Sequence, residues 1–151
     1  MAESAALLAR IEAESREHQA MWTLAVALGT RGRVVLILGD AARADALLRE
    51  SVRIRHQLGD TWSLMHNLTH LADAATMQSD PRRAAIIYGA VDSLTEQTGA
   101  SIFPAWQDLS DRYQATAIAD AGLETFQENR FEGRHLSLDE VIQTATGDAV
   151  A

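Results

Sequence analysis

Apolar residues along most of the chain recur at the three- and four-residue spacing of amphipathic helices. One predicted stripe consists of Leu24, Leu28, Val35 and Leu38. A second stripe begins after a polar break near residue 40 with Leu47, Leu48, Val52 and Ile54. Each stripe needs a partner to cover it, so the pattern predicts helices of about 17 residues that pack against one another. We therefore expect an all-α fold.

The predicted helices are separated by very short turns. Gly39-Asp40 and Gly59-Asp60 stand between apolar stripes, and Asp80-Pro81 takes the equivalent place later in the chain. Glycine tolerates the left-handed backbone that ends many helices, and an aspartate carboxylate accepts a hydrogen bond from an unpaired N–H of the next helix. Proline suits the first helical position, where no hydrogen bond is lost. These dipeptides therefore predict a helix start directly after a helix end.

The middle of the chain contains an internal repeat. Residues 21–60 and 61–100 align without a gap at a shift of 40 positions, which places Trp22 on Trp62 and keeps the turn residues in register. Residues 1–20 continue the register as half a repeat, because their leucines match those of the second predicted helix. A period of this length predicts a solenoid of helical hairpins with about 40-residue repeats over residues 1–100.

Residues 101–151 break the period, and we expect them to form a C-terminal helical cap on the repeats. Pro104 is predicted to open one helix, and a short helix is expected to end at Gly133. Ser137 and Glu140 have the spacing of a capping box, which predicts the start of a last short helix.

Composition narrows the classes of function. The chain has 151 residues, 21 acidic and 13 basic, and its net charge of −8 disfavours binding to nucleic acid, whose phosphates attract cations. The longest apolar run is VVLIL, far short of the roughly 20 residues of a membrane span. The absence of cysteine excludes disulfides and thiolate chemistry. We expect a cytoplasmic protein with no membrane contact.

The segment HNLTH is the sharpest chemical candidate. It places His66 and His70 one helical turn apart with Asp73 three residues further, a spacing that allows three ligands on one face to share a metal. A metalloprotease would need Glu where Asn67 stands, so the general base is missing. The competing interpretation is a polar stripe that faces a partner or solvent. If the helix lines a concave groove, the binding residues would be Thr30, Arg33, His66, Thr69, His70 and Asp73.

Two further groups of residues have a structural and a functional interpretation. Arg49, Arg53 and their neighbours in RESVRIRH could bind phosphate, but a charged helix face paired with acids is the simpler explanation. Trp22, Trp62 and Trp106 could stack on ligands, but their apolar context favours core packing. The sequence contains no recognisable catalytic set, so we expect no enzyme activity, no cofactor and no resident metal.

The segments GDAARADALLRESVRIRHQLGD and SDPRRAAIIYGAVDSL resemble tetratricopeptide hairpins, although the period of the repeat is longer than usual. Together with FQENRFEGRHLSLDEVIQTA, they resemble the C-terminal region of bacterial signalling ATPases that act as LuxR-type, MalT-like transcriptional regulators. The resemblance implies a non-catalytic protein-interaction and regulatory module that binds a protein partner or other modules of its parent regulator. The alternative is a helical protein that binds a small molecule or metal through His66, His70 and Asp73.

The first predicted helix also suggests self-association. It has the pattern of a second helix of a hairpin, so Leu7, Leu8 and Ile11 would belong to an apolar surface that a neighbouring element should cover. We therefore expect a homo-oligomer that forms through this N-terminal helix.

Overall fold

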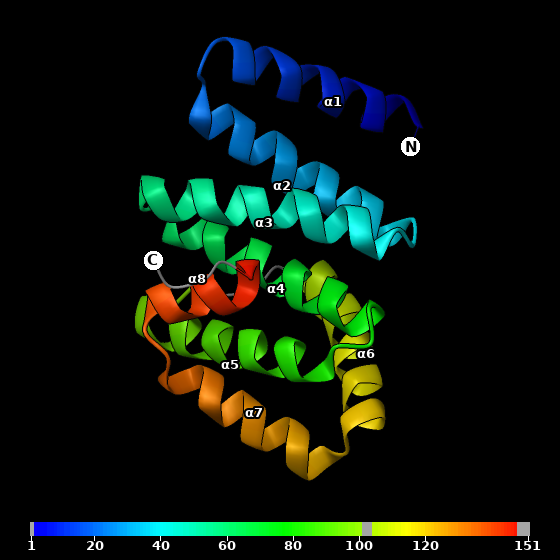
Figure 1. Cartoon of the computed structure of the whole chain (residues 1–151), viewed down its shortest axis with the longest axis vertical. Coiled ribbons are helices and arrows are strands. Elements are labelled where there is room, and N and C mark those ends of the chain that lie inside the picture. Colours follow the sequence, from blue (N-terminus) through cyan, green and yellow to red (C-terminus); the bar gives the residue numbers. More distant parts are fainter. Residues whose placement is uncertain (1, 101–103, 148–151) are drawn as a thin grey trace.

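The computed structural model describes residues 2–100 and 104–147, and within these ranges the chain folds into eight α-helices with no strand. The expected all-α class is confirmed. Figure 1 shows the arrangement. The helices are α1 Ala2–Glu17, α2 Met21–Ile37, α3 Ala41–Leu58, α4 Thr61–Met77, α5 Pro81–Thr98, α6 Pro104–Ala121, α7 Leu123–His135 and α8 Leu138–Thr146. Among the described helices, none combines the length and low polarity that crossing a membrane requires.

The first five helices pack in chain order, each against the next, and form a stack along the long axis of the molecule (Figure 1). The bounds of these helices recur at a fixed interval. Helix α2 covers residues 21–37 and α4 covers 61–77, while α3 covers 41–58 and α5 covers 81–98. Two consecutive hairpins therefore have matching lengths and matching turns.

The predicted turn signals are confirmed by the caps of the helices. Asp40, Asp60 and Asp80 are N-caps, and their side chains accept hydrogen bonds of 3.1, 3.2 and 3.1 Å from the backbone N–H three residues later. Gly39 and Gly59 have φ values of 90° and 67°, in the region that favours glycine. Each short connection thus satisfies backbone groups on both sides of the turn.

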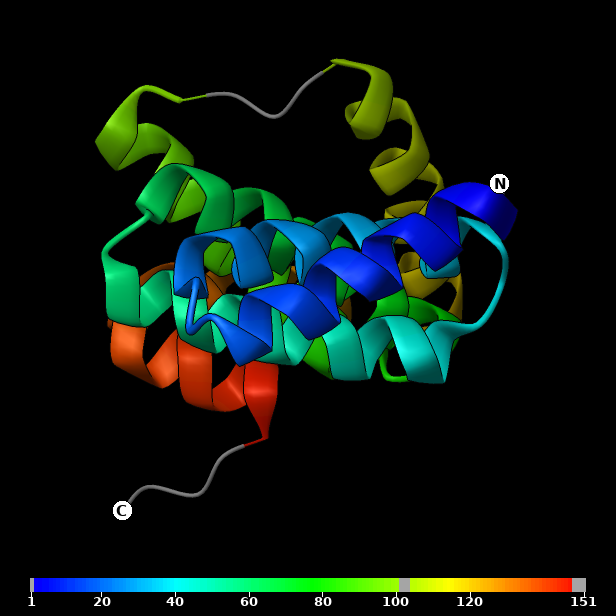
Figure 2. The same cartoon turned by 90° about the horizontal axis from the view of Figure 1, so that it is seen from above.

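The C-terminal helices pack along the sides of the stack as well as at its end. Helix α7 packs against α5, α6 packs against α4 and α5, and α8 packs against α3 and α5. Figure 2 shows α6 and α8 on opposite sides of the stack. The predicted capping box of α8 is confirmed, because Ser137 and Glu140 bond reciprocally. The C-terminal helices, which were expected to cap one end of the repeats, therefore also cover two sides of the helical stack.

The prediction that a helix ends at Gly133 is wrong, because α7 continues to His135 and Gly133 is buried within it. A Cβ atom at Gly133 would lie 1.9 Å from the carbonyl oxygen of Ile86 on α5. Glycine is needed there for a close approach between two helices, and its backbone remains helical.

The core contains Leu64, Leu68, Leu71, Ile87 and Phe126, all of which are buried. These residues bring α4, α5 and α7 together around one apolar cluster. Burying such side chains is the main stabilising contribution to a fold of this kind.

The prediction that the tryptophans belong to the core is wrong for Trp22 and Trp62, which are 62% and 51% exposed. Each occupies the second position of its helix and lies two residues, or about 200° of helical turn, from the buried leucine that follows. Trp106 on α6 is half-buried. The tryptophans are therefore surface or cavity residues.

Candidate functional site

The polar stripe of α4 is covered by another helix. His66, Thr69, His70 and Asp73 are all buried, with exposed fractions between 1% and 4%. The Trp106 ring of α6 lies 5.3 Å from the His66 ring and 5.4 Å from the His70 ring, centroid to centroid. The residues expected to line an open groove therefore lie buried beside α6, and the alternative of a solvated helix face is wrong. The reason is tertiary, since α6 belongs to the segment outside the repeat.

Two cavities flank the covered stripe. The larger one, of about 480 Å³, lies among α4, α5, α6 and α7, and Thr69 is among its lining residues. The smaller one, of about 120 Å³, is lined by Thr30, Arg33, His66 and His70 together with residues of α3 and α6. The structure therefore gathers four of the six predicted binding residues around one cavity and places a fifth at the other.

Asp73, the sixth predicted residue, joins helices through hydrogen bonds. Its Oδ1 accepts hydrogen bonds from the Tyr88 hydroxyl at 2.6 Å and the Ser110 hydroxyl at 3.0 Å. Its Oδ2 lies 3.5 Å from Nδ1 of His70. Burial and the neighbouring Asp73 carboxylate raise the pKa of Tyr88 far above its usual range, so this hydroxyl remains a donor. Asp73 therefore links α4 to α5 and α6.

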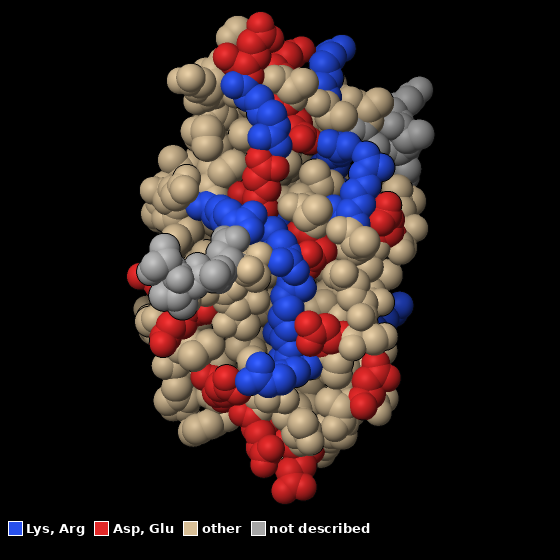
Figure 3. Space-filling view, viewed as in Figure 1, with Lys and Arg blue, Asp and Glu red and all other residues tan. Residues whose placement is uncertain are grey.

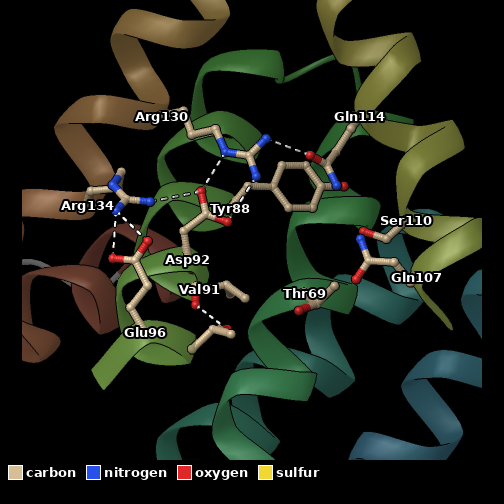
Figure 4. Close-up of a pocket in the computed structure, with 11 residues that line it drawn as sticks. Thr69, Tyr88, Val91, Asp92, Glu96, Gln107, Ser110, Gln114, Arg130 and Arg134 are labelled. Carbon is tan, nitrogen blue, oxygen red and sulfur yellow. Dashed lines mark hydrogen bonds and ion pairs between the residues drawn. The ribbon is translucent and has the colours of Figure 1, made fainter. Parts of the chain in front are cut away.

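Ion pairs between α5 and α7 form one wall of the larger cavity. Asp92 accepts two hydrogen bonds from Arg130, at 2.7 and 2.9 Å, and Glu96 accepts two from Arg134, at 2.8 and 2.7 Å. Figure 4 shows these pairs opposite the polar side chains of α6, with Gln114 accepting a further bond of 2.7 Å from Arg130. The paired Asp92 carboxylate raises the pKa of Arg130. The cavity thus offers both donors and acceptors around charges that are largely balanced within the wall.

This wall was not predicted from the sequence. Its signal is a pair of acids four residues apart, Asp92 and Glu96, and a pair of arginines four residues apart, Arg130 and Arg134. Residues at that spacing share a helix face. The two pairs are 38 residues apart in the chain, so only knowledge that α5 packs against α7 matches one with the other.

The smaller cavity has a cationic lining. The Arg33 guanidinium lies over the Trp106 ring, 4.4 Å from its centroid, and burial lowers the pKa of Arg33. Arg55 is buried and bonds to Asp60 at 2.5 Å. Nδ1 of His66 lies 2.9 Å from the Trp62 carbonyl, and burial is the main cause that lowers the pKa of His66. At neutral pH this ring is uncharged and donates from Nδ1.

The arginine-rich segment of α3 forms hydrogen bonds with the C-terminal end of α8. Arg49 and Arg53 donate to the Thr146 carbonyl at 2.6 and 3.3 Å, and Arg83 donates to the Ala145 carbonyl at 2.5 Å. Cations at this end of α8 complement its helix dipole. Figure 3 shows a band of basic side chains on this face with acidic side chains beside it. The simpler interpretation of this segment, a charged face with internal partners, therefore fits its contacts better than a phosphate site.

Within the described residues, no group of three or more His, Asp or Glu side chains is placed to hold a metal ion. Asp73 directs one oxygen toward Tyr88 and Ser110, while His66 directs Nδ1 toward a backbone carbonyl. His66 and Asp73 are therefore engaged by α4 itself and by the neighbouring helices α5 and α6.

No protein family, curated protein or solved structure matches the chain.

Proposed function

We propose that the chain is a non-catalytic interaction and regulatory module built as a tetratricopeptide-like solenoid. In this proposal it is the sensor or docking end of a larger bacterial regulator of the LuxR-type, MalT-like kind. The 40-residue interval between the bounds of α2 and α4, and of α3 and α5, supports the repeat. The resemblance of the turn and C-terminal segments supports the type of parent protein.

The observation that carries the proposal is the larger cavity, where the hairpin of α4 and α5 meets α6 and α7. Its volume of about 480 Å³ falls within the range of sites that hold small ligands or side chains of a bound peptide. The lining is rich in amides, hydroxyls and paired charges, which suits a polar segment of a protein partner. Binding without chemistry requires only such complementary donors and acceptors.

Occupation of this cavity would act on the packing of α6. Gln107 and Gln114 reach the cavity from α6, while Asp92 and Arg130 reach it from α5 and α7. A partner that bonds both to α6 and to α5 or α7 binds most tightly to one relative placement of these helices. Its binding shifts the population of the protein toward that placement. The module would transmit the shift to the rest of a parent regulator.

Selection from a displayed library of random peptides, with the immobilised chain as target, tests this function directly. Gln107 is exposed on α6 and lines the larger cavity, so Gln107→Trp should obstruct its entrance. Gln127 is exposed on α7 and does not line the cavity, so Gln127→Trp is the matched control. Circular dichroism should show the same helical content for both variants.

We expect the wild-type chain to enrich peptides with a shared polar motif, and we expect Gln107→Trp to lose their capture by about tenfold or more. The control variant should retain it. Failure to enrich any motif, or equal capture by both variants, would contradict docking at this cavity.

The second candidate function is binding of a small molecule beside His66 and His70. It is favoured by a separate observation, namely that these residues line the smaller cavity together with Thr30 and Arg33. The metal-binding form of this candidate has less support, since Asp73 is engaged by Tyr88 and Ser110.

A further inference from the structure

The smaller cavity has a charge that contrasts with the rest of the molecule. The chain carries a net charge of −8, yet among the described lining residues of this cavity there are two arginines, Arg33 and Arg55, and two histidines but no carboxylate. The remaining polar lining comes from Thr30, Ser63 and Asn67. Cations gathered in a partly enclosed space raise the local concentration of anions.

Arg33 has no acidic partner among the described residues. Within residues 2–100 and 104–147 its guanidinium forms no hydrogen bond or ion pair, and its contact is the face of Trp106. Partial burial removes some of the hydration of this group and lowers its pKa. A half-buried cation of this kind is stabilised when an anion supplies the missing acceptor.

Arg55 provides a second donor to the same cavity. The residue is 6% exposed, and while one of its terminal nitrogens bonds to Asp60, its Nε has no hydrogen-bond acceptor among the described residues. Nδ1 of His70 is likewise buried and has no hydrogen-bond partner in the described part of the chain, with Asp73 Oδ2 at 3.5 Å. Arg55 and His70 therefore add buried polar side chains to the lining of the cavity, and Arg55 adds a second guanidinium.

The two hairpins carry opposite charges at the position of Arg33. Arg33 on α2 and Asp73 on α4 are equivalent positions 40 residues apart. In the second hairpin the carboxylate of Asp73 binds Tyr88 and Ser110 inside the protein. In the first hairpin the equivalent arginine faces a cavity.

We infer that the smaller cavity binds a compact oxyanion, with Arg33 as its main binding residue and Arg55 as a supporting donor. A volume of about 120 Å³ accommodates a phosphate-sized ion or the carboxylate end of a small molecule. The planar guanidinium of Arg33 matches two oxygens of either group. This site is the one named for the second candidate function, and it is separate from the larger cavity where docking is proposed.

Titration of the full chain with sodium phosphate, followed by NMR of the tryptophan indole N–H signals, tests the site. The chain has three tryptophans, so the spectrum is simple, and Trp→Phe variants assign the signals. Trp106 contacts Arg33 and should report binding, whereas Trp22 is exposed and does not line the cavity. Sodium chloride keeps the ionic strength constant, and sodium acetate forms a separate arm.

We expect a saturable shift of the Trp106 signal with phosphate and little change at Trp22. Arg33→Gln should weaken the apparent affinity by about tenfold or more, and Arg33→Lys should lose less because it retains the charge. Arg43→Gln removes the same charge from an exposed position of α3 and should leave the affinity unchanged.

Saturation by phosphate alone would identify a tetrahedral oxyanion, and saturation by acetate as well would identify a carboxylate; both support the inference. A Trp106 shift that is linear up to high millimolar phosphate, or that chloride reproduces, would overturn it. An equal loss in Arg33→Gln and Arg43→Gln would also overturn it, because it would indicate a general effect of surface charge.

Discussion

Gly89 on α5 and Gly133 on α7 make reciprocal contacts between their helices. A Cβ atom at Gly89 would lie 1.9 Å from the Arg130 carbonyl oxygen, and one at Gly133 would lie 1.9 Å from the Ile86 carbonyl oxygen. Neither distance can be accommodated without moving backbone. The two glycines therefore set the separation at which Arg130 reaches Asp92 and forms the wall of the larger cavity.

Gly133→Ala should disrupt the packing of α7 on α5. Although alanine favours the helix itself, the added methyl group must push a carbonyl of α5 away, and we expect a loss of about 1–3 kcal/mol in the free energy of unfolding. Urea denaturation measures the change. Gln127→Ala on the exposed face of α7 is the control and should cost little. An unchanged midpoint in Gly133→Ala would contradict the close approach of the helices.

Tyr88→Phe should reveal the contribution of the hydrogen bond to Asp73. The hydroxyl is buried and donates to a carboxylate at 2.6 Å, so its removal should cost about 1.5–3 kcal/mol of stability. Tyr113→Phe is the matched control, because Tyr113 is half-buried and forms no hydrogen bond within the described residues. A double-mutant cycle with Asp73→Asn should give a clear coupling energy for Tyr88. Equal losses in the two Tyr→Phe variants would contradict this role.

Stability should fall as the pH is lowered through the ordinary pKa of histidine, near 6.5, because of His66. Burial, aided by the nearby His70 and Arg55, lowers the pKa of His66 in the folded state. The unfolded chain then takes up a proton at a pH where the folded chain does not, so the free energy of unfolding decreases toward lower pH.

Urea denaturation between about pH 7.5 and pH 5.5 measures this slope. His66→Gln should make it shallower. His135→Gln is the control, since His135 makes a similar contact with the carbonyl four residues earlier but is exposed. A slope that persists unchanged in His66→Gln would assign the effect to another group.

The outer face of α1 is expected to mediate self-association. Leu7 is 50% exposed, and Leu8 and Ile11 are half-buried at the end of the stack. Leu7→Glu with Ile11→Glu should convert an oligomer into a monomer, as measured by light scattering. Leu123→Glu with Phe131→Glu adds the same charge to exposed apolar positions of α7 and should leave the assembly intact. Monomeric wild-type protein, or dissociation only in the α7 variant, would contradict an α1 interface.

The sequence alone determined the helices and most of their boundaries. Stripes such as Leu24 and Leu28 have the helical period, and Asp40, Asp60 and Ser137 cap the helix that follows each of them. These signals are local, because a cap or a turn depends on residues within three or four positions of one another. The helical class and nearly every boundary could therefore be predicted.

The environment of each helix face was decided only by tertiary structure. His66 and Asp73 have the pattern of a groove-facing stripe, yet α6 covers them, and Gly133 has the character of a helix end, yet α5 requires it within α7. In the candidate site Arg33 contacts Trp106, which lies 73 positions later in the sequence. Periodicity describes which side of a helix is apolar, but burial of a polar side depends on which distant helix packs against it.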